Sequence, residues 1–176
     1  METVGTITFD AGYLPRHVDD PILPSSGEEL AAVVDEMNSS PNEDCDYLSI
    51  AVIDSEGSHV AQMGVGVRAG DSLGCLYYIG SEGDFYSKGT RAADEPVAYY
   101  DFGNERLFAP GSQIPLNAVK HALIQLFDSG GARPSSVEWQ EWHSWIVDLD
   151  DDDEAKEQYS VPQAHAPGPD YSDPPF

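Results

Sequence analysis

The sequence has few basic residues, and this shortage limits the partners that the chain can bind. Lys and Arg together number 8 among 176 residues, against 32 Asp and Glu, so the formal net charge is −24. Binding nucleic acid through its phosphates requires Lys and Arg, and an anionic membrane surface repels an acidic protein. We therefore expect no nucleic-acid partner and no membrane partner, and instead a protein with a basic surface.

The sequence also lacks long hydrophobic runs and a leader-like N-terminus. No stretch approaches the ~18 apolar residues of a membrane span. Residues 1–10 carry neither a basic nor an apolar leader region, so we expect no signal peptide and a cytoplasmic protein. Without an export signal, reduced thiols at Cys45 and Cys75 are favoured over a disulfide, although the sequence leaves a disulfide open. We interpret Cys75 as a buried structural thiol.

Motifs of catalysis and of cofactor binding are missing too. The five histidines are scattered without metal-ligand spacing. The Gly64–Gly66 stretch lacks the third glycine and the following helix of a dinucleotide-binding loop, so close packing within a strand explains it better. The aspartates of residues 148–152 resemble the start of a calcium loop, but Asp153 and Tyr159 stand where that loop needs Gly and Glu. We therefore expect no catalytic residue, no cofactor and no metal.

Two amphipathic helices are predicted. A capping box, formed by Ser25 or Ser26 with a glutamate three residues later, begins an apolar pattern of helical spacing over residues 26–37. The second helix covers residues 115–128. It starts with Pro115 at the first helical position, carries one apolar stripe and is stopped by the Gly130–Gly131 pair.

Short β-rich segments separated by turns predict an antiparallel meander. The expected strands cover residues 3–9, 47–53, 59–67, 73–79, 97–102 and 105–108, and a last strand passes through Trp139. Residues 140–149 fit either a strand or a helix, and both alternatives stay open. The predicted fold class is α+β, an antiparallel β-sheet meander with two main helices packed on it.

The character of the chain changes from Asp148 onward. Residues 148–154 hold six acids in seven positions, and residues 162–176 are rich in proline. This composition predicts a disordered acidic tail over residues 150–176, after a single α+β domain over residues 1–149. The residues from Asp148 on carry nine acids and one lysine, a charge of −8, which leaves −16 on the first 147 residues. The folded domain is therefore acidic in its own right.

Aromatic side chains among acidic ones indicate a surface for a basic partner. Aromatic anchors supply binding energy, while the acids speed encounter and reject wrong partners. The candidate contact residues are Asp84, Tyr99, Tyr100, Asp101, Glu138, Glu141 and Trp142. For each aromatic residue, a place in the hydrophobic core is the competing interpretation. Trp139 is the aromatic residue that we expect to anchor the core.

Residues 114–139, IPLNAVKHALIQLFDSGGARPSSVEW, resemble a family of immunity proteins from bacterial polymorphic toxin systems. The family pattern is a helix, a Gly-Arg-Pro-type turn and a tryptophan on the next strand, here Gly130 or Gly131, Arg133, Pro134 and Trp139. The resemblance implies an α+β domain without catalytic residues. It also implies that the protein is made beside a toxin, often one with a deaminase-type domain, and blocks it in the producing cell.

The predicted function is that of an immunity protein bound to a cognate toxin. The expected toxin is a deaminase that acts on nucleic acid, and the expected mechanism is occlusion of its basic active-site cleft. The alternative is an acidic regulatory or DNA-mimic module that binds another basic protein. A small hydrolase that uses paired carboxylates is a third alternative, because so acidic a chain always brings some carboxylates together.

Overall fold

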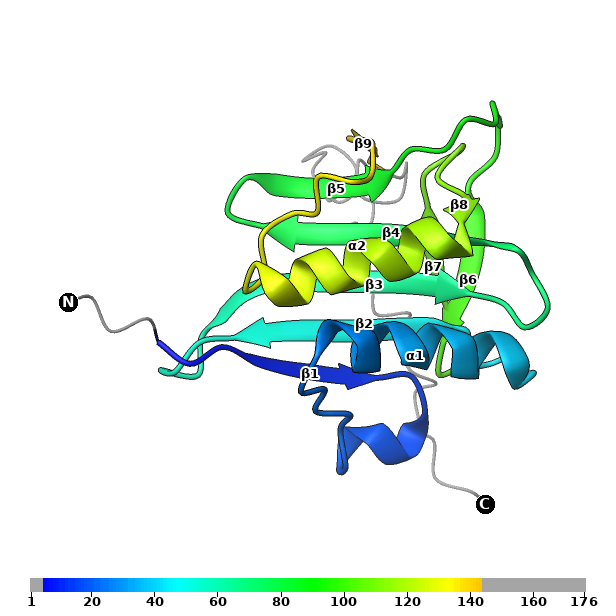
Figure 1. Ribbon diagram of the computed structural model, residues 1–176. Coiled ribbons are helices and arrows are strands. Elements are labelled where there is room, and N and C mark those ends of the chain that lie inside the picture. Colours follow the sequence, from blue (N-terminus) through cyan, green and yellow to red (C-terminus); the bar gives the residue numbers. More distant parts are fainter. Residues whose placement is uncertain (1–4, 144–176) are drawn as a thin grey trace, which may run out of the picture. The chain divides into compact units, whose positions relative to one another are not determined.

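A computed structural model describes residues 5–143, in which two α-helices cover one face of an antiparallel sheet (Figure 1). The elements in chain order are β1 (Thr8–Gly12), the short 3-10 helix η1 (Pro15–Val18), α1 (Gly27–Ser39), β2 (Tyr47–Ile53), β3 (His59–Val67), β4 (Leu73–Gly80), β5 (Gly83–Ser87), β6 (Val97–Asp101), β7 (Asn104–Phe108), β8 (Ile114–Pro115), α2 (Leu116–Asp128) and β9 (Trp139–Gln140). The predicted α+β class is confirmed. Residues 144–149 and the predicted tail lie outside the described residues.

The main sheet has seven strands in the order β1-β2-β3-β4-β5-β9, with β8 paired to β4. The predicted strands over 47–53, 59–67 and 73–79 are confirmed as β2, β3 and β4, and the last strand does pass through Trp139. The expected first strand over 3–9 is wrong in its position along the chain. Strand β1 spans Thr8–Gly12, because its pairing with β2 places Phe9 and Ala11 in the core.

Two further strand predictions need correction. The segments predicted over 97–102 and 105–108 do form strands β6 and β7, but these pair only with each other, in a separate two-stranded sheet. Strand β5, Gly83–Ser87, is absent from the predicted set. Its five residues, GDFYS, begin with a glycine and an aspartate, residues that are depleted in strands, so the local pattern reads as a turn.

Local hydrogen bonds explain where the helices begin. Ser26 is the N-cap of α1: its Oγ accepts from the Glu29 N–H at 3.1 Å, and the Glu29 carboxylate accepts from the Ser25 N–H at 2.8 Å. Helix α2 begins at Leu116, one residue later than predicted, because Pro115 pairs with Leu73 of β4. The predicted glycine stop is confirmed, since Gly130 and Gly131 have φ values of 69° and 106°.

Helices α1 and α2 lie side by side on the same face of the sheet (Figure 1). A Cβ atom on Gly27 would lie 2.9 Å from the Ile124 Cα, so the two helix backbones approach closely at this glycine. The main core between helices and sheet is apolar, and Trp139 packs against it with its Nε1–H donating to the Pro134 carbonyl at 2.8 Å. Among the described residues, no helix has the length and apolar character needed to cross a bilayer.

The opposite face of the sheet carries the β6–β7 hairpin over a second, smaller core. Tyr99 and Phe108 of the hairpin are buried there with Cys75 of β4. Glycines on β3 make room for the rings: a Cβ on Gly66 would lie 2.4 Å from the ring of Tyr99. The predicted close packing at Gly64–Gly66 is thus confirmed. Both cysteines are free and buried, as favoured, and the disulfide alternative is not realised.

Candidate functional site

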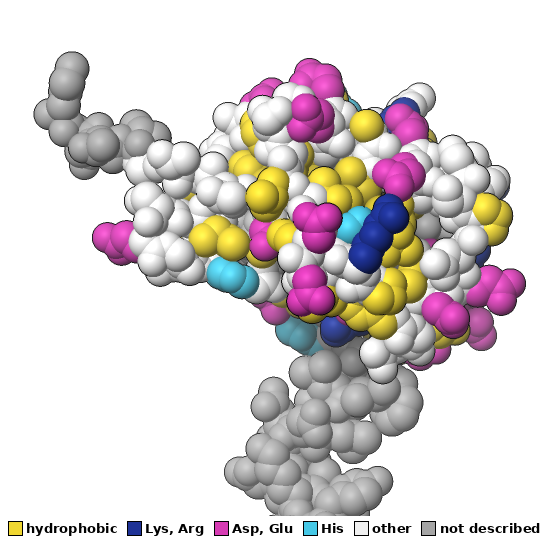
Figure 2. Space-filling model, turned by 90° about the horizontal axis from the view of Figure 1, so that it is seen from below, with side chains coloured by type: hydrophobic (Ala, Val, Ile, Leu, Met, Phe, Trp, Pro, Cys, Tyr) yellow, Lys and Arg dark blue, Asp and Glu magenta, His cyan; other side chains and the backbone are white. Residues whose placement is uncertain are grey.

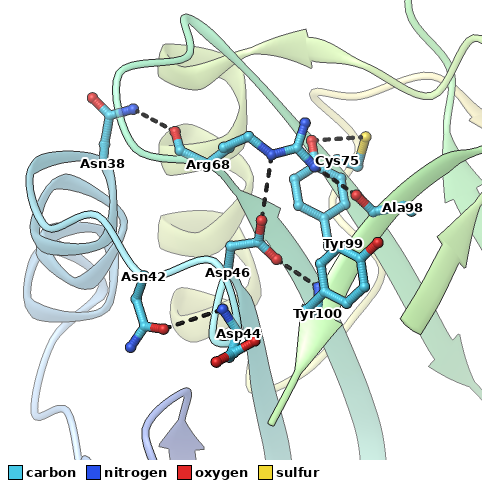
Figure 3. Close-up of polar contacts among 9 residues, drawn as sticks. All are labelled: Asn38, Asn42, Asp44, Asp46, Arg68, Cys75, Ala98, Tyr99 and Tyr100. Carbon is cyan, nitrogen blue, oxygen red and sulfur yellow. Dashed lines mark hydrogen bonds and ion pairs between the residues drawn. The ribbon is translucent and has the colours of Figure 1, made fainter. Parts of the chain in front are cut away.

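An open pocket of about 640 Å³ lies where β3 ends, between the loop that follows α1 and the β6–β7 hairpin. Three segments far apart in the sequence meet there, as Figure 3 shows for Asp46, Arg68 and Tyr100. The lining residues are Pro41, Asn42, Glu43, Asp44, Asp46, Arg68, Ala69, Tyr100 and Gly103. We call this hollow the acidic pocket, because three of its residues are acids and one is basic.

Asp46 connects the walls of the acidic pocket. Its carboxylate accepts a hydrogen bond from the Tyr100 N–H at 2.5 Å and lies 3.4 Å from the Arg68 Nε (Figure 3). Its backbone carbonyl accepts from the Val67 N–H at 3.0 Å, at the end of β3. Every polar group of Asp46 thus has a partner, and the residue fixes the hairpin relative to the main sheet.

Arg68 is held in place by contacts within the chain. Its guanidinium donates to the Ala98 carbonyl at 2.6 Å and lies 5.0 Å from the centre of the Tyr99 ring, a cation–π distance. Asn38, at the end of α1, supports the same turn by donating from its side-chain amide to the Arg68 carbonyl at 3.1 Å. Arg68, the one basic residue that lines the pocket, is therefore already bound to other groups of the protein.

The pocket keeps an excess of negative charge. Glu43 and Asp44 are exposed on its rim, whereas Asp46 is buried. Burial raises the pKa of the Asp46 carboxyl, and the hydrogen bond from the Tyr100 N–H together with the nearby Arg68 offsets part of that rise. Acidic side chains are also scattered over the face shown in Figure 2, where Lys and Arg are sparse. An acidic hollow with an aromatic wall has the chemistry to receive a Lys or Arg side chain.

The hairpin residues of the predicted contact set lie in or beside the pocket, with one exception. Tyr100 lines the pocket and is half-buried. Asp101 follows it and is paired with Arg106 at 3.0 Å. Tyr99 is fully buried at 0% exposure, so its core interpretation holds and its side chain does not reach the surface.

The other predicted contact residues form a second group near strand β5. Asp84, Glu138 and Glu141 are exposed, and Trp142 packs edge-on against Tyr86 with ring centres 5.5 Å apart. The Asp84 carboxylate accepts a hydrogen bond from the Tyr77 hydroxyl at 3.1 Å. This group lies away from the acidic pocket, of which none of its members is a lining residue.

A continuous set of aromatic contacts joins the two groups. Tyr86 lies 5.9 Å from Phe108, which in turn lies 5.2 Å from Tyr99, with near-perpendicular rings in both pairs. Such edge-to-face pairs are favourable and rigid. Tyr86, Phe108 and Tyr99, which we call the aromatic layer, therefore connect the two groups on the sheet face that the helices leave free.

The sequence pattern did not single out Asp46 and Arg68 of the pocket, or Asn38, which supports the Arg68 turn. All three are polar residues at element ends, and their neighbours along the chain are those of ordinary turn residues. The one available signal is Asp46 directly before a strongly apolar strand, because an acid in that position often enters a hydrogen bond with a loop backbone.

Comparison with known protein families gives a match over most of the chain. The model of a family described as "Immunity protein Imm1" matches residues 18–141 of the chain. The match includes every element from α1 to β9 and all the residues that line the acidic pocket. No curated protein matches the chain.

Proposed function

Since this chain belongs to the Imm1 family of immunity proteins and so neutralises a cognate toxin, we propose that it does so by inserting its acidic pocket face into a basic cleft of that toxin. The observation that carries this proposal is the excess of acids around Asp46 and Tyr100 on a hydrogen-bonded framework. Acids on such a framework meet a basic surface without a large cost of ordering.

The toxin that fits this charge is one that acts on nucleic acid. An enzyme that binds DNA or RNA places Lys and Arg along its substrate cleft to contact phosphates. The chain carries 32 acids, so it offers the sign of charge that a nucleic acid offers. The resemblance over residues 114–139 supports a deaminase-type toxin as the first choice.

The protein then inhibits the toxin by physically blocking its substrate cleft and not by a chemical reaction. The acids attract the basic cleft over a distance, and the Debye length of about 10 Å at ~0.1 M salt limits that attraction to the final approach. Once the pocket and the rings beside it are seated, the substrate has no access to the cleft. The contact residues proposed for this surface are Tyr100 and Asp101 near the pocket, with Asp84, Glu138, Glu141 and Trp142 at the far end of the aromatic layer.

The proposal is tested with the cognate toxin, which the family resemblance implies is encoded beside this gene. The purified pair should form a stable complex, and the toxin in that complex should lose turnover of its nucleic-acid substrate. A matched reaction with excess substrate should slow complex formation, because substrate and inhibitor compete for one cleft. A stable complex in which the toxin keeps full activity would refute occlusion, and substrate that does not compete would place the contact outside the cleft.

A further inference from the structure

The tip of the β6–β7 hairpin carries an aromatic residue in an unfavourable backbone conformation. Phe102 and Gly103 form its two-residue turn, since Asp101 pairs with Asn104, and their φ values are 51° and 78°. Turns of this type need positive φ at both central positions and therefore favour Asn, Asp or Gly. Among residues 5–143, Phe102 is the one non-glycine residue with a positive φ.

Packing within the chain does not explain why phenylalanine stands there. Its side chain is 44% exposed, and neither of the two hydrophobic clusters in the described residues includes it. A strained backbone combined with an exposed apolar ring lowers the stability of the free protein on both counts. Features of this kind are concentrated at binding sites, where the strain presents a side chain to a ligand.

The ring is presented on a rigid support beside the acidic pocket. The Gly103 N–H donates to the Asp44 carbonyl at 2.9 Å, and Tyr100 is bonded to Asp46 through its backbone N–H. The Asn104 side chain donates to the Asp101 carbonyl at 3.1 Å and closes the turn from the other side. The tip is therefore already ordered in the free protein and loses little conformational entropy when a partner binds it.

The charges around the ring define the partner. Asp44 lies on the pocket side of the tip and Glu105 follows the turn in the hairpin, whereas the Asp101 carboxylate is paired with Arg106. An apolar ring framed by carboxylates matches an apolar recess framed by Lys or Arg. A second copy of this chain fits poorly, because it would bring two acidic rims together.

We propose that Phe102 is the aromatic anchor of the toxin interface, entering an apolar recess in the basic face of the toxin. This inference rests on the proposed function and adds to it the residue that supplies most of the short-range binding energy. The acids of the pocket guide the encounter, and the ring then fixes the register of the two proteins.

The test variant is Phe102→Asn, which removes the ring and places a turn-favouring residue at the same backbone angles. The probe is the same cognate toxin. We expect binding to weaken at least about tenfold, as for a central aromatic contact, while the melting temperature of the free protein stays the same or rises. Val60→Asn is the matched control, because Val60 is 42% exposed and lies at the other end of β3 from Arg68; its toxin affinity should be unchanged.

Three results would overturn the assignment. Unchanged affinity in Phe102→Asn would show that the ring is not an anchor. A fall in melting temperature alongside the fall in affinity would show that the ring serves the fold. A dimer of the free protein that Phe102→Asn dissociates, seen by sedimentation, would assign the ring to a second copy. If the wild-type chain itself does not bind the toxin, the proposed function fails, and that outcome is distinct from an unaffected variant.

Discussion

Asp46 and Tyr100 exchange two hydrogen bonds across the boundary between the two sheets. The Asp46 N–H donates to the Tyr100 carbonyl at 3.1 Å, and the Tyr100 N–H donates to the Asp46 Oδ1 at 2.5 Å. One side chain thus completes a backbone pairing and positions the hairpin at the edge of the acidic pocket.

Asp46→Ala should lower the free energy of unfolding by about 1–3 kcal/mol, because it leaves a half-buried Tyr100 N–H without an acceptor. Asp46→Asn is the control. Its amide oxygen can still accept from Tyr100, and the Arg68 side chain is 47% exposed, so the lost ion pair costs less than about 1 kcal/mol. Burial raises the pKa of Asp46, so the fold tolerates a neutral group there. Urea unfolding measures both variants, and an equal loss of unfolding free energy in Asp46→Ala and Asp46→Asn would contradict this account.

Gly66→Ala should destabilise the protein more than Gly64→Ala. At position 66 the new Cβ would lie 2.4 Å from the ring of the fully buried Tyr99, which has no space to move into. At position 64 it would meet the hydroxyl and the adjoining ring edge of Tyr47, a side chain that is only partly buried and so has more room to shift. We expect a loss of about 1–3 kcal/mol for Gly66→Ala, as for overpacking in a core. Urea unfolding of both variants measures the difference, and a reversed order would refute it.

Alkaline pH should destabilise the aromatic layer. Burial raises the pKa of Tyr47 from 10.0 to about 12, and burial also raises the pKa values of Tyr77 and Tyr99. The unfolded chain therefore loses these protons at lower pH than the folded chain, so stability is complete below pH 10 and falls as the pH rises toward 12. For Tyr47 the loss should reach at most about 3 kcal/mol. Unfolding curves across this range check it, and Tyr47→Phe should reduce the slope.

Neutralising the rim of the pocket should slow binding without affecting the fold. Glu43→Gln combined with Asp44→Asn removes two exposed charges, and we expect the association rate with the toxin to fall about threefold to tenfold at low salt. The difference should shrink as salt is added. The matched control is Asp19→Asn with Asp20→Asn, two exposed acids that follow η1. If the control slows association equally, net charge and not the pocket guides the encounter.

Deleting residues 150–176 should leave folding intact and slow toxin binding by only about twofold to threefold, through loss of long-range attraction. The deleted segment lies beyond the family match, which ends at residue 141. Thermal unfolding and stopped-flow association of the shortened chain check this. Loss of folding would show that the domain needs the segment, and complete loss of protection would show that the segment is the inhibitor.

The elements predicted correctly from sequence are those specified by neighbouring residues. Ser26 and Glu29 lie one helical turn apart and define the start of α1, and the Gly130–Gly131 pair ends α2. The position of the β6–β7 hairpin relative to the main sheet could not be predicted in this way. Whether residues 97–101 join the main sheet or cross above it depends on a missing side chain at Gly66, which is distant in sequence.

The same distinction explains the candidate site. Tyr100 and Asp101 were named because an aromatic residue beside an acid is a local pattern. Asp46 and Arg68 are separated by 22 residues and are joined by β2 and β3 running in opposite directions. Phe102 has an ordinary sequence context, and its importance rests on a backbone angle that the sequence does not display.

The protein has two hydrophobic cores of unequal size, and we expect the residues around them to tolerate substitution to different degrees. The large core between helices and sheet holds the fold, whereas the hairpin rests on a small cluster around Cys75, Tyr99 and Phe108. Substitutions at the hairpin tip therefore leave the large core intact. A lineage of such proteins can change its tip to follow a changing toxin while it inherits the same scaffold, so relatives should vary most at the tip and least beneath the helices.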